Sequence, residues 1–187
     1  MKAIFLDIDG VLNAFGTDKN TRSKSRCGSF LGIDKDKTKR LAKIVEETNA
    51  ILILVSSWKN GWQPKRRYQI YSDFENNYHA KYLDNHLKKK GNLILTDKTK
   101  ERDSNYRGKG IKDYLILHPN ITEWIVIDDE IFIDYQKEGI LPHLIKTNST
   151  YGLTDDDAVA AINMLNNQAI GLYEATPENK KENNHGN

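Results

Sequence analysis

Short apolar runs alternate with longer polar or amphipathic segments along most of the chain. Five runs are rich in leucine and β-branched residues, and we predict strands there: residues 3–8, 51–57, 92–96, 123–128 and 143–148. Between them, apolar residues recur at steps of three and four, which predicts helices over 36–48 and 108–118. Another helix is expected after Thr154, which can be its N-cap because Asp157 follows three residues later.

The alternation of strands and helices predicts the fold class. Nearly continuous apolar strands are typical of a sheet that is covered on both faces, as in a doubly wound, mostly parallel α/β sheet of five strands. We expect one domain over residues 1–173, because 174–187 are polar and lack periodicity, which predicts a disordered tail. Sheets of this class bind ligands outside the carboxyl ends of their strands.

The composition says more about the cellular location of the protein than about its fold. Among the 187 residues, 38% are hydrophobic and 29% are charged, and no apolar run is long enough to span a membrane. A signal-peptide pattern is missing, and Cys27 is the only cysteine, so we expect a cytoplasmic protein without an internal disulfide. The net charge is only +2, but basic residues are concentrated in a few stretches.

Polar residues stand where the predicted strands end. They are Asp7 and Asp9 at the carboxyl end of the first strand, Ser56 and Ser57 at the end of the second, Lys109 in the helix after the third, and Asp128 and Asp129 at the end of the fourth. In a parallel sheet these ends share one edge, and clustered carboxylates repel one another unless a cation neutralises them. Oxygen-only ligands suit Mg²⁺, and hydroxyl and ammonium groups beside it are suitable donors to phosphate. The pattern therefore predicts a phosphoryl-transfer site.

Four stretches of the chain, "FLDIDGVLN", "VSSWK", "YRGKGIKDYL" and "WIVIDDE", resemble in order and spacing the four motifs of the haloacid dehalogenase (HAD) superfamily of phosphohydrolases. The resemblance covers roughly residues 1 to 170. With the later stretch "IKTNSTYGLTDDDAVAAINML", the chain is most similar to the small HAD domain of composite RNA-repair proteins and of stand-alone bacterial and phage proteins.

The resemblance implies a role for each acid. Asp7 would be the nucleophile that forms an aspartyl-phosphate, and Asp9 would be the general acid and then the general base. An acid at the position of Asp9 favours a phosphatase over the ATPases, phosphonate-cleaving enzymes and dehalogenases of the superfamily. Mg²⁺ would be bound by Asp7, by the backbone carbonyl of Asp9, and by Asp128 and Asp129.

The same resemblance assigns the groups that contact the phosphate. Ser56 would hydrogen-bond the phosphoryl group, and Lys109 would neutralise Asp7 and the phosphate together. Gly10 would let the chain turn where a side chain would crowd the phosphate.

Three assignments stay open at this point. Ser57 could replace Ser56, since adjacent strand residues point in opposite directions. Arg107 and Lys112 compete with Lys109 for the cation, and we count Arg107 with Gly10 and Ser57 as substrate-binding residues. Asp129 could cap the next turn and leave Asp128 as the only metal ligand of the pair.

The size of the substrate can be inferred from whether a cap domain covers the site. Residues 13–35 are too few for a cap domain and are expected to form a flap, and residues 58–107 leave little over for a cap. An open site admits a nucleic-acid end, DNA or RNA, and we expect basic residues to surround it: Lys19, Arg22, Lys24, Arg26, Lys59, Lys65, Arg66, Arg67, Lys98, Lys100, Arg102 and Arg107. The alternatives are a phosphatase of free nucleotides or other small phosphomonoesters, and a binder without turnover.

Aromatic residues near the second strand could serve this substrate or the core. Trp58, Trp62 and Tyr68 could stack on bases, or the two tryptophans could pack a helix against the sheet. A stripe at helical spacing favours the core over a nucleic-acid platform: Tyr71, Phe74, Tyr78 and Tyr82.

Overall fold

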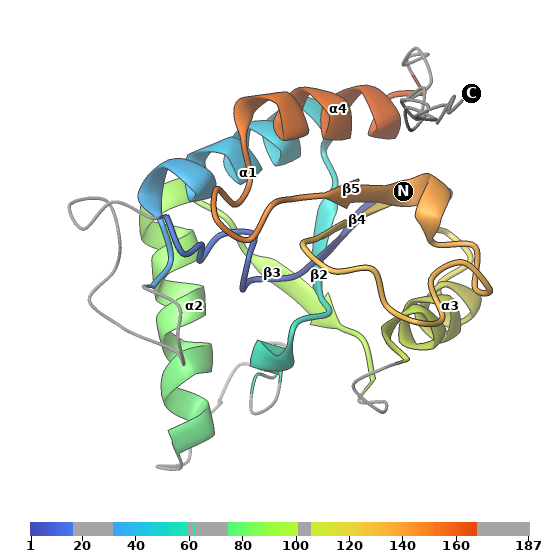
Figure 1. Cartoon of the computed structure of the whole chain (residues 1–187), viewed down its shortest axis with the longest axis horizontal. Coiled ribbons are helices and arrows are strands. Elements are labelled where there is room, and N and C mark those ends of the chain that lie inside the picture. The colour runs from blue at the N-terminus through green and yellow to red at the C-terminus, as the bar shows by residue number, and fades with distance from the viewer. Residues whose placement is uncertain (17–31, 60–61, 63–74, 101–105, 168–187) are drawn as a thin grey trace, which may run out of the picture.

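The computed structural model describes residues 1–16, 32–59, 62, 75–100 and 106–167, and the side chains of 75–82 are left aside. Five strands form one sheet: β1 (Lys2–Leu6), β2 (Ile51–Leu54), β3 (Leu95–Lys98), β4 (Glu123–Asp128) and β5 (Leu144–Lys146). The helices are α1 (Lys35–Thr48), α2 (Glu75–Gly91), α3 (Arg107–Leu117) and α4 (Asp155–Leu165), with short 3₁₀ turns η1 (Ser57–Lys59) and η2 (Leu141–His143). The strand order is β3-β2-β1-β4-β5 and every pairing is parallel, so the predicted fold class is confirmed (Figure 1).

Alternating side chains of the central strands supply two separate cores. Ile4 and Leu6 of β1 pack with α1, α2 and α4, whereas Ala3 and Phe5 of the same strand pack with α3. Figure 1 shows α1 and α4 side by side, with α3 on the other side of the sheet. Both faces of the sheet are therefore covered, which explains why the strands are apolar at nearly every position.

The order of the strands along the chain shows where a ligand site is expected. From β1 the chain moves outward through β2 to β3, and then returns across the sheet to β4 on the other side of β1. Because strand crossovers are right-handed, the reversal of direction puts α3 on the face opposite to α1 and α2. The switch point lies between β1 and β4, where ligand sites of this fold class are found.

The predicted cap of the last helix is confirmed. Thr154 precedes α4, and its hydroxyl oxygen accepts a hydrogen bond from the backbone N–H of Asp157, whose carboxylate accepts the N–H of Thr154 in return. Asp34 caps α1 in a similar way through two backbone N–H groups of its first turn.

The third strand begins later than predicted. The apolar run 92–96 was expected to be the strand, but β3 starts at Leu95. Asn92 has a left-handed φ of 52°, and the Leu93 N–H bonds to the Leu87 carbonyl, so the first residues of the run close α2. Leu93 is buried in the core as a helix-end residue, and Ile94 is exposed.

Several predictions lie outside the described residues. They concern most of the 13–35 flap with its basic residues and Cys27, the tail, and these residues near the second and third strands: Lys65, Arg66, Arg67, Tyr68, Tyr71, Phe74 and Arg102. The side chains of Tyr78 and Tyr82 also stay undescribed. Within the described ranges, no helix is both long and apolar enough to cross a membrane.

His86 predicts a pH dependence of stability. Its ring is buried on α2, and in the described part of the chain its Nε2 atom has no hydrogen-bond partner. Burial, with a smaller effect of Lys90, lowers the pKa of His86 from 6.5 to about 4. The unfolded chain takes up this proton first, so the stabilisation is complete above pH 6.5 and is lost as the pH falls toward 4.

We therefore expect His86→Leu to flatten the fall in the free energy of unfolding between pH 7.5 and 4.5 by about 1–2 kcal/mol, a value reduced for solvent screening. Urea titrations of both proteins across this range measure the difference. Parallel curves for wild type and variant would contradict the prediction.

Candidate functional site

Three carboxylates meet at the switch point of the sheet. Asp7 directly follows β1, Asp128 ends β4, and Asp129 is the next residue. One carboxylate oxygen of each lies within 4.8 Å of the others, and Asp7 and Asp128 are buried. The parallel pairing of β1 with β4 explains this placement, because both strands end at the same level. The structure thus brings together three of the four acids that the sequence analysis singled out.

The electrostatics of this cluster call for a cation. Burial raises the pKa of Asp7 well above its ordinary value, and the other carboxylates raise it further against the opposing effect of Arg107. Burial, Asp128 and Glu130 raise the pKa of Asp129 to about 6. A divalent cation would relieve this repulsion, and an all-oxygen donor set of carboxylates fits a hard ion such as Mg²⁺. The residues present therefore fit the metal that was predicted.

Arg107 is the protein's own cation at this cluster. Its Nη1 atom lies 3.0 Å from Asp7 Oδ1 and 2.5 Å from Asp128 Oδ2. The guanidinium carbon also lies 4.1 Å from the centroid of the Phe132 ring, a cation–π distance. Burial alone would lower the pKa of Arg107, but Asp7 and Asp128 outweigh it and raise the pKa, so the group stays charged.

Lys109, the residue first expected to neutralise Asp7, is differently engaged. Its ammonium lies 2.8 Å from Asp113 Oδ1, one turn along α3, and its side chain is about half exposed. Residues that are two positions apart on a helix are rotated by about 200° around its axis. Arg107 and Lys109 therefore leave α3 in nearly opposite directions. The structure brings Arg107, which the sequence analysis ranked as a competitor, to the acids.

A spacing signal could have favoured Arg107. Ile111 and Tyr114, the buried residues of α3, lie four and seven positions after Arg107 and therefore share its face. The signal was weak because Ile116 and Leu117 are equally apolar and yet exposed.

The loop after β4 holds Arg107 and Asp128 in place. The sequence analysis did not identify the residues of this loop. Phe132 lies against the guanidinium, and the Tyr135 hydroxyl donates to Asp128 Oδ2 at 2.8 Å. Asp134 is buried and accepts the N–H groups of Gly108 and Lys109, the second and third residues of α3, at 3.0 and 2.7 Å. These contacts fix the start of α3, where Arg107 stands. The loop has no periodicity that would have revealed them.

Asp9 is held apart from the three carboxylates. Its Oδ1 atom accepts a hydrogen bond from Asn13 Nδ2 at 2.7 Å, and its Oδ2 atom accepts one from Trp58 Nε1 at 2.9 Å. Asn13 Oδ1 in turn accepts the backbone N–H of Gly32 at 2.7 Å. The carboxylate is thus oriented by two donors from different elements, next to the position of Asp7.

Gly10 is required by a neighbour rather than by the turn alone. Its φ is +74°, and a Cβ atom there would lie 2.1 Å from Asp129 Cγ. The Thr147 hydroxyl donates to the Gly10 carbonyl at 2.9 Å and ties this turn to the chain after β5. A side chain here would therefore crowd Asp129, and the predicted crowding of the phosphate stays a prediction.

The two serines after β2 differ in exposure. Ser56 is buried, and its Oγ atom accepts the Trp58 N–H at 3.4 Å, whereas Ser57 is exposed at the start of η1. Trp58 and Trp62 are both buried in the core, and Trp62 Nε1 donates to Asp84 at 3.0 Å. The burial agrees with the packing alternative for the two tryptophans and leaves little of either ring for stacking on a base.

Basic residues from two strand ends meet beside the site. Lys59 Nζ donates to Thr99 Oγ1 and to the Lys100 carbonyl, each at 3.1 Å, and Lys98 Nζ donates to the Lys59 carbonyl at 3.0 Å. These contacts join three of the basic residues that the sequence analysis expected around the site, and their role there stays a prediction.

Comparison with known proteins identifies a family. A sequence model of the HAD domain in Swiss Army Knife RNA repair proteins matches residues 3–158. No curated protein and no solved structure matches the chain significantly.

Proposed function

The chain belongs to the family of HAD domains in Swiss Army Knife RNA repair proteins, and on that premise we propose that it is a Mg²⁺-dependent phosphomonoester hydrolase that acts on nucleic-acid terminal phosphates. The observation that carries the proposal is the cluster of the buried Asp7 and Asp128 with the half-buried Asp129, and the Arg107 guanidinium against it. With a divalent cation held by the carboxylates, the fixed guanidinium beside it would suit the transfer of a dianionic phosphoryl group.

We propose the following reaction. A carboxylate oxygen of Asp7 attacks phosphorus, and the bond from phosphorus to the leaving oxygen breaks as the Asp9 carboxyl gives that oxygen its proton. Water then attacks the aspartyl-phosphate and loses a proton to Asp9, which releases inorganic phosphate and restores Asp7. Arg107 offsets the charge on the phosphoryl oxygens in both steps. Mg²⁺ bound by the carboxylates would neutralise further charge there.

The nucleic-acid part of the proposal rests on the surroundings of the site. Lys59, which follows β2 in η1, and Lys98, which ends β3, contact each other on the carboxyl side of the sheet, where the carboxylates also lie. Of the residues described between β2 and β3, only those of η1 and α2 are helical, and α2 packs on α1 as part of the core. Basic residues on the carboxylate side of the sheet favour a large polyanion over a small substrate.

Phosphate release from matched substrates tests this function. We expect release from an oligonucleotide with a 3′-phosphate or a 5′-phosphate, in Mg²⁺ but not in chelator, with a rate that falls as salt rises. Mononucleotides with the same base and phosphate position serve as controls. Equal, salt-insensitive turnover of mononucleotides would instead indicate a nucleotide phosphatase, and binding without release would indicate a binder.

Asn13 gives a separate test of the role of Asp9. Asn13→Ala removes one of the two donors that orient the Asp9 carboxylate. We expect kcat to fall about tenfold for an alkyl phosphate, whose leaving oxygen needs a proton, and about threefold or less for p-nitrophenyl phosphate. Asn120→Ala on the exposed surface is the control. Equal losses on both substrates would contradict a role of Asn13 in the proton transfer from Asp9 to the leaving oxygen.

A further inference from the structure

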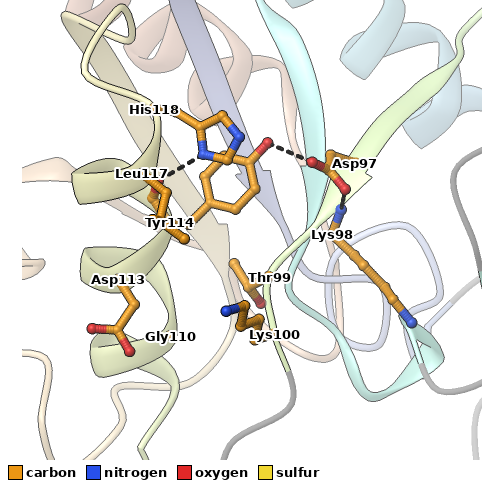
Figure 2. Close-up of a pocket in the computed structure, with 9 residues that line it drawn as sticks. All are labelled: Asp97, Lys98, Thr99, Lys100, Gly110, Asp113, Tyr114, Leu117 and His118. Atoms are coloured by element: carbon orange, nitrogen blue, oxygen red, sulfur yellow. Dashed lines mark hydrogen bonds between the residues drawn. The ribbon is translucent and has the colours of Figure 1, made fainter.

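A pocket of about 300 Å³ lies between α3 and the carboxyl end of β3, outside the carboxylate cluster. Residues 97–100 form one wall and one side of α3 forms the other (Figure 2). The residues that matter for its chemistry are Asp97, Thr99, Lys100, Gly110, Tyr114 and His118. Its volume is at the lower end of the range for small-molecule sites, so it suits a compact ligand.

One end of the pocket is aromatic. The imidazole of His118 stacks on the Tyr114 ring with centroids 3.9 Å apart and planes 16° apart. The pair is rigid because the Tyr114 hydroxyl donates to Asp97 Oδ2 at 2.9 Å and His118 Nδ1 lies 2.8 Å from the Tyr114 carbonyl. Tyr114 is buried and the imidazole covers one of its faces, so the half-buried His118 ring is the one that can stack on a flat heteroaromatic ligand.

The other end of the pocket is polar and holds the Lys100 ammonium and the Asp113 carboxylate. In Figure 2 the Lys98 side chain runs away from α3, whereas the Lys100 ammonium faces it. Gly110 and Asp113 lie opposite, and Gly110 offers only its backbone. The Lys100 ammonium can donate to a sugar hydroxyl or a base carbonyl, and the Asp113 carboxylate, which also pairs with Lys109, can accept from a hydroxyl or an amino group.

The pocket lies at a suitable distance from the acids. β3 is two strands from β1 in the sheet, which is about 10 Å at the usual strand spacing. Tyr114 is seven residues after Arg107 on α3, again about 10 Å along the helix axis. Gly110, at the near end, is less than one turn from Arg107. A phosphate at Arg107 therefore leaves its nucleoside within reach of both ends of the pocket.

We propose that this pocket binds the nucleoside that carries the scissile phosphate, with the sugar near Gly110 and Lys100 and the base near Tyr114 and His118. The proposal deepens the function proposed above and rests on it. It makes the enzyme selective for nucleotide and nucleic-acid phosphates over other phosphomonoesters of similar reactivity.

The first test compares substrates. For His118→Ala we expect the ratio of kcat/KM on a terminally phosphorylated oligonucleotide to kcat/KM on p-nitrophenyl phosphate to fall about tenfold, the loss of one stacking contact. Lys100→Gln should lower the same ratio. His143→Ala is a matched control, because His143 stacks on Trp124 at 3.7 Å and its Nδ1 lies 3.1 Å from the Trp124 carbonyl, away from the pocket. An unchanged ratio in both pocket variants would overturn the proposal.

The second test does not depend on turnover. Adenosine, guanosine, cytidine and uridine, which lack the phosphate, are each added to the ¹⁵N-labelled protein. We expect a shift of the Gly110 and Leu117 amide signals with at least one of them, and a weaker shift in His118→Ala. Hydrolysis of phosphomonoesters by a protein that shows no such shift would refute nucleoside binding in this pocket and leave the proposed function standing. Shifts at Gly110 in a protein without phosphatase activity would refute the proposed function and keep the pocket.

Discussion

Replacing Asp7 with Asn is expected to lower kcat for phosphate release by at least about 10⁴-fold, the largest effect of any single change considered. The amide is close in shape to the carboxylate but cannot form the aspartyl-phosphate. Asp36→Asn, an exposed change on α1, is the matched control and should leave kcat within about twofold. Residual activity of Asp7→Asn above one per cent of wild type would contradict a nucleophilic role for this residue.

The same variant should be more stable than wild type in the absence of metal, although it is less active. Burial raises the pKa of Asp7 in the folded protein, so its ionised form at neutral pH destabilises the metal-free fold, and this penalty is absent below the ordinary pKa of aspartate. The neutral amide relieves it, and we expect the metal-free Tm to rise by about 2–4 °C. Added Mg²⁺ should stabilise wild type and have less effect on the variant, because one ligand has been lost. Thermal unfolding with Mg²⁺ and with chelator measures both effects.

Arg107→Ala carries the second-largest expected effect, a loss of about 10³-fold in kcat/KM. The guanidinium is the cation seen against Asp7 and Asp128, and no other charge of α3 is recorded at these two carboxylates in the described part of the chain. Arg107→Lys should recover only part of the activity, because a single ammonium cannot reproduce the planar fork over Phe132.

Lys109→Ala is the comparison that tests which cation matters. The Lys109 ammonium pairs with Asp113, so we expect a loss of about tenfold or less. Circular dichroism of both variants controls for folding. A loss for Lys109→Ala that exceeded the loss for Arg107→Ala would return the central role to Lys109 and contradict the role inferred from the structure.

Arg107→Ala also distinguishes the effect of Arg107 on stability from its effect on the rate of the reaction. Without the guanidinium, the three carboxylates repel one another in a buried site, so the metal-free Tm should fall. Mg²⁺ should restore much of that stability without restoring the rate. A Tm that is unchanged in chelator would show that Arg107 contributes little to the balance of charge.

The sequence by itself determined the fold class and the position of the acids. Buried parallel strands are apolar at nearly every position, and this pattern is local, so β1, β2 and β4 could be found without any tertiary contact. Acids directly after β1 and β4 must then meet at one edge, because parallel strands end at the same side. The beginning of β3 was misjudged because a helix end and a strand start share one apolar run, and only the left-handed Asn92 separates them.

Only the tertiary structure decided which cation faces the acids and what holds it. Apolar residues lie on more than one side of α3, so the sequence leaves the rotation of this helix open. Burial of Ile111 and Tyr114 under the sheet, together with the cap from Asp134, fixes that rotation and turns Arg107 inward. Contacts of this kind join residues far apart in the chain, and their free energy depends on packing that no local pattern records.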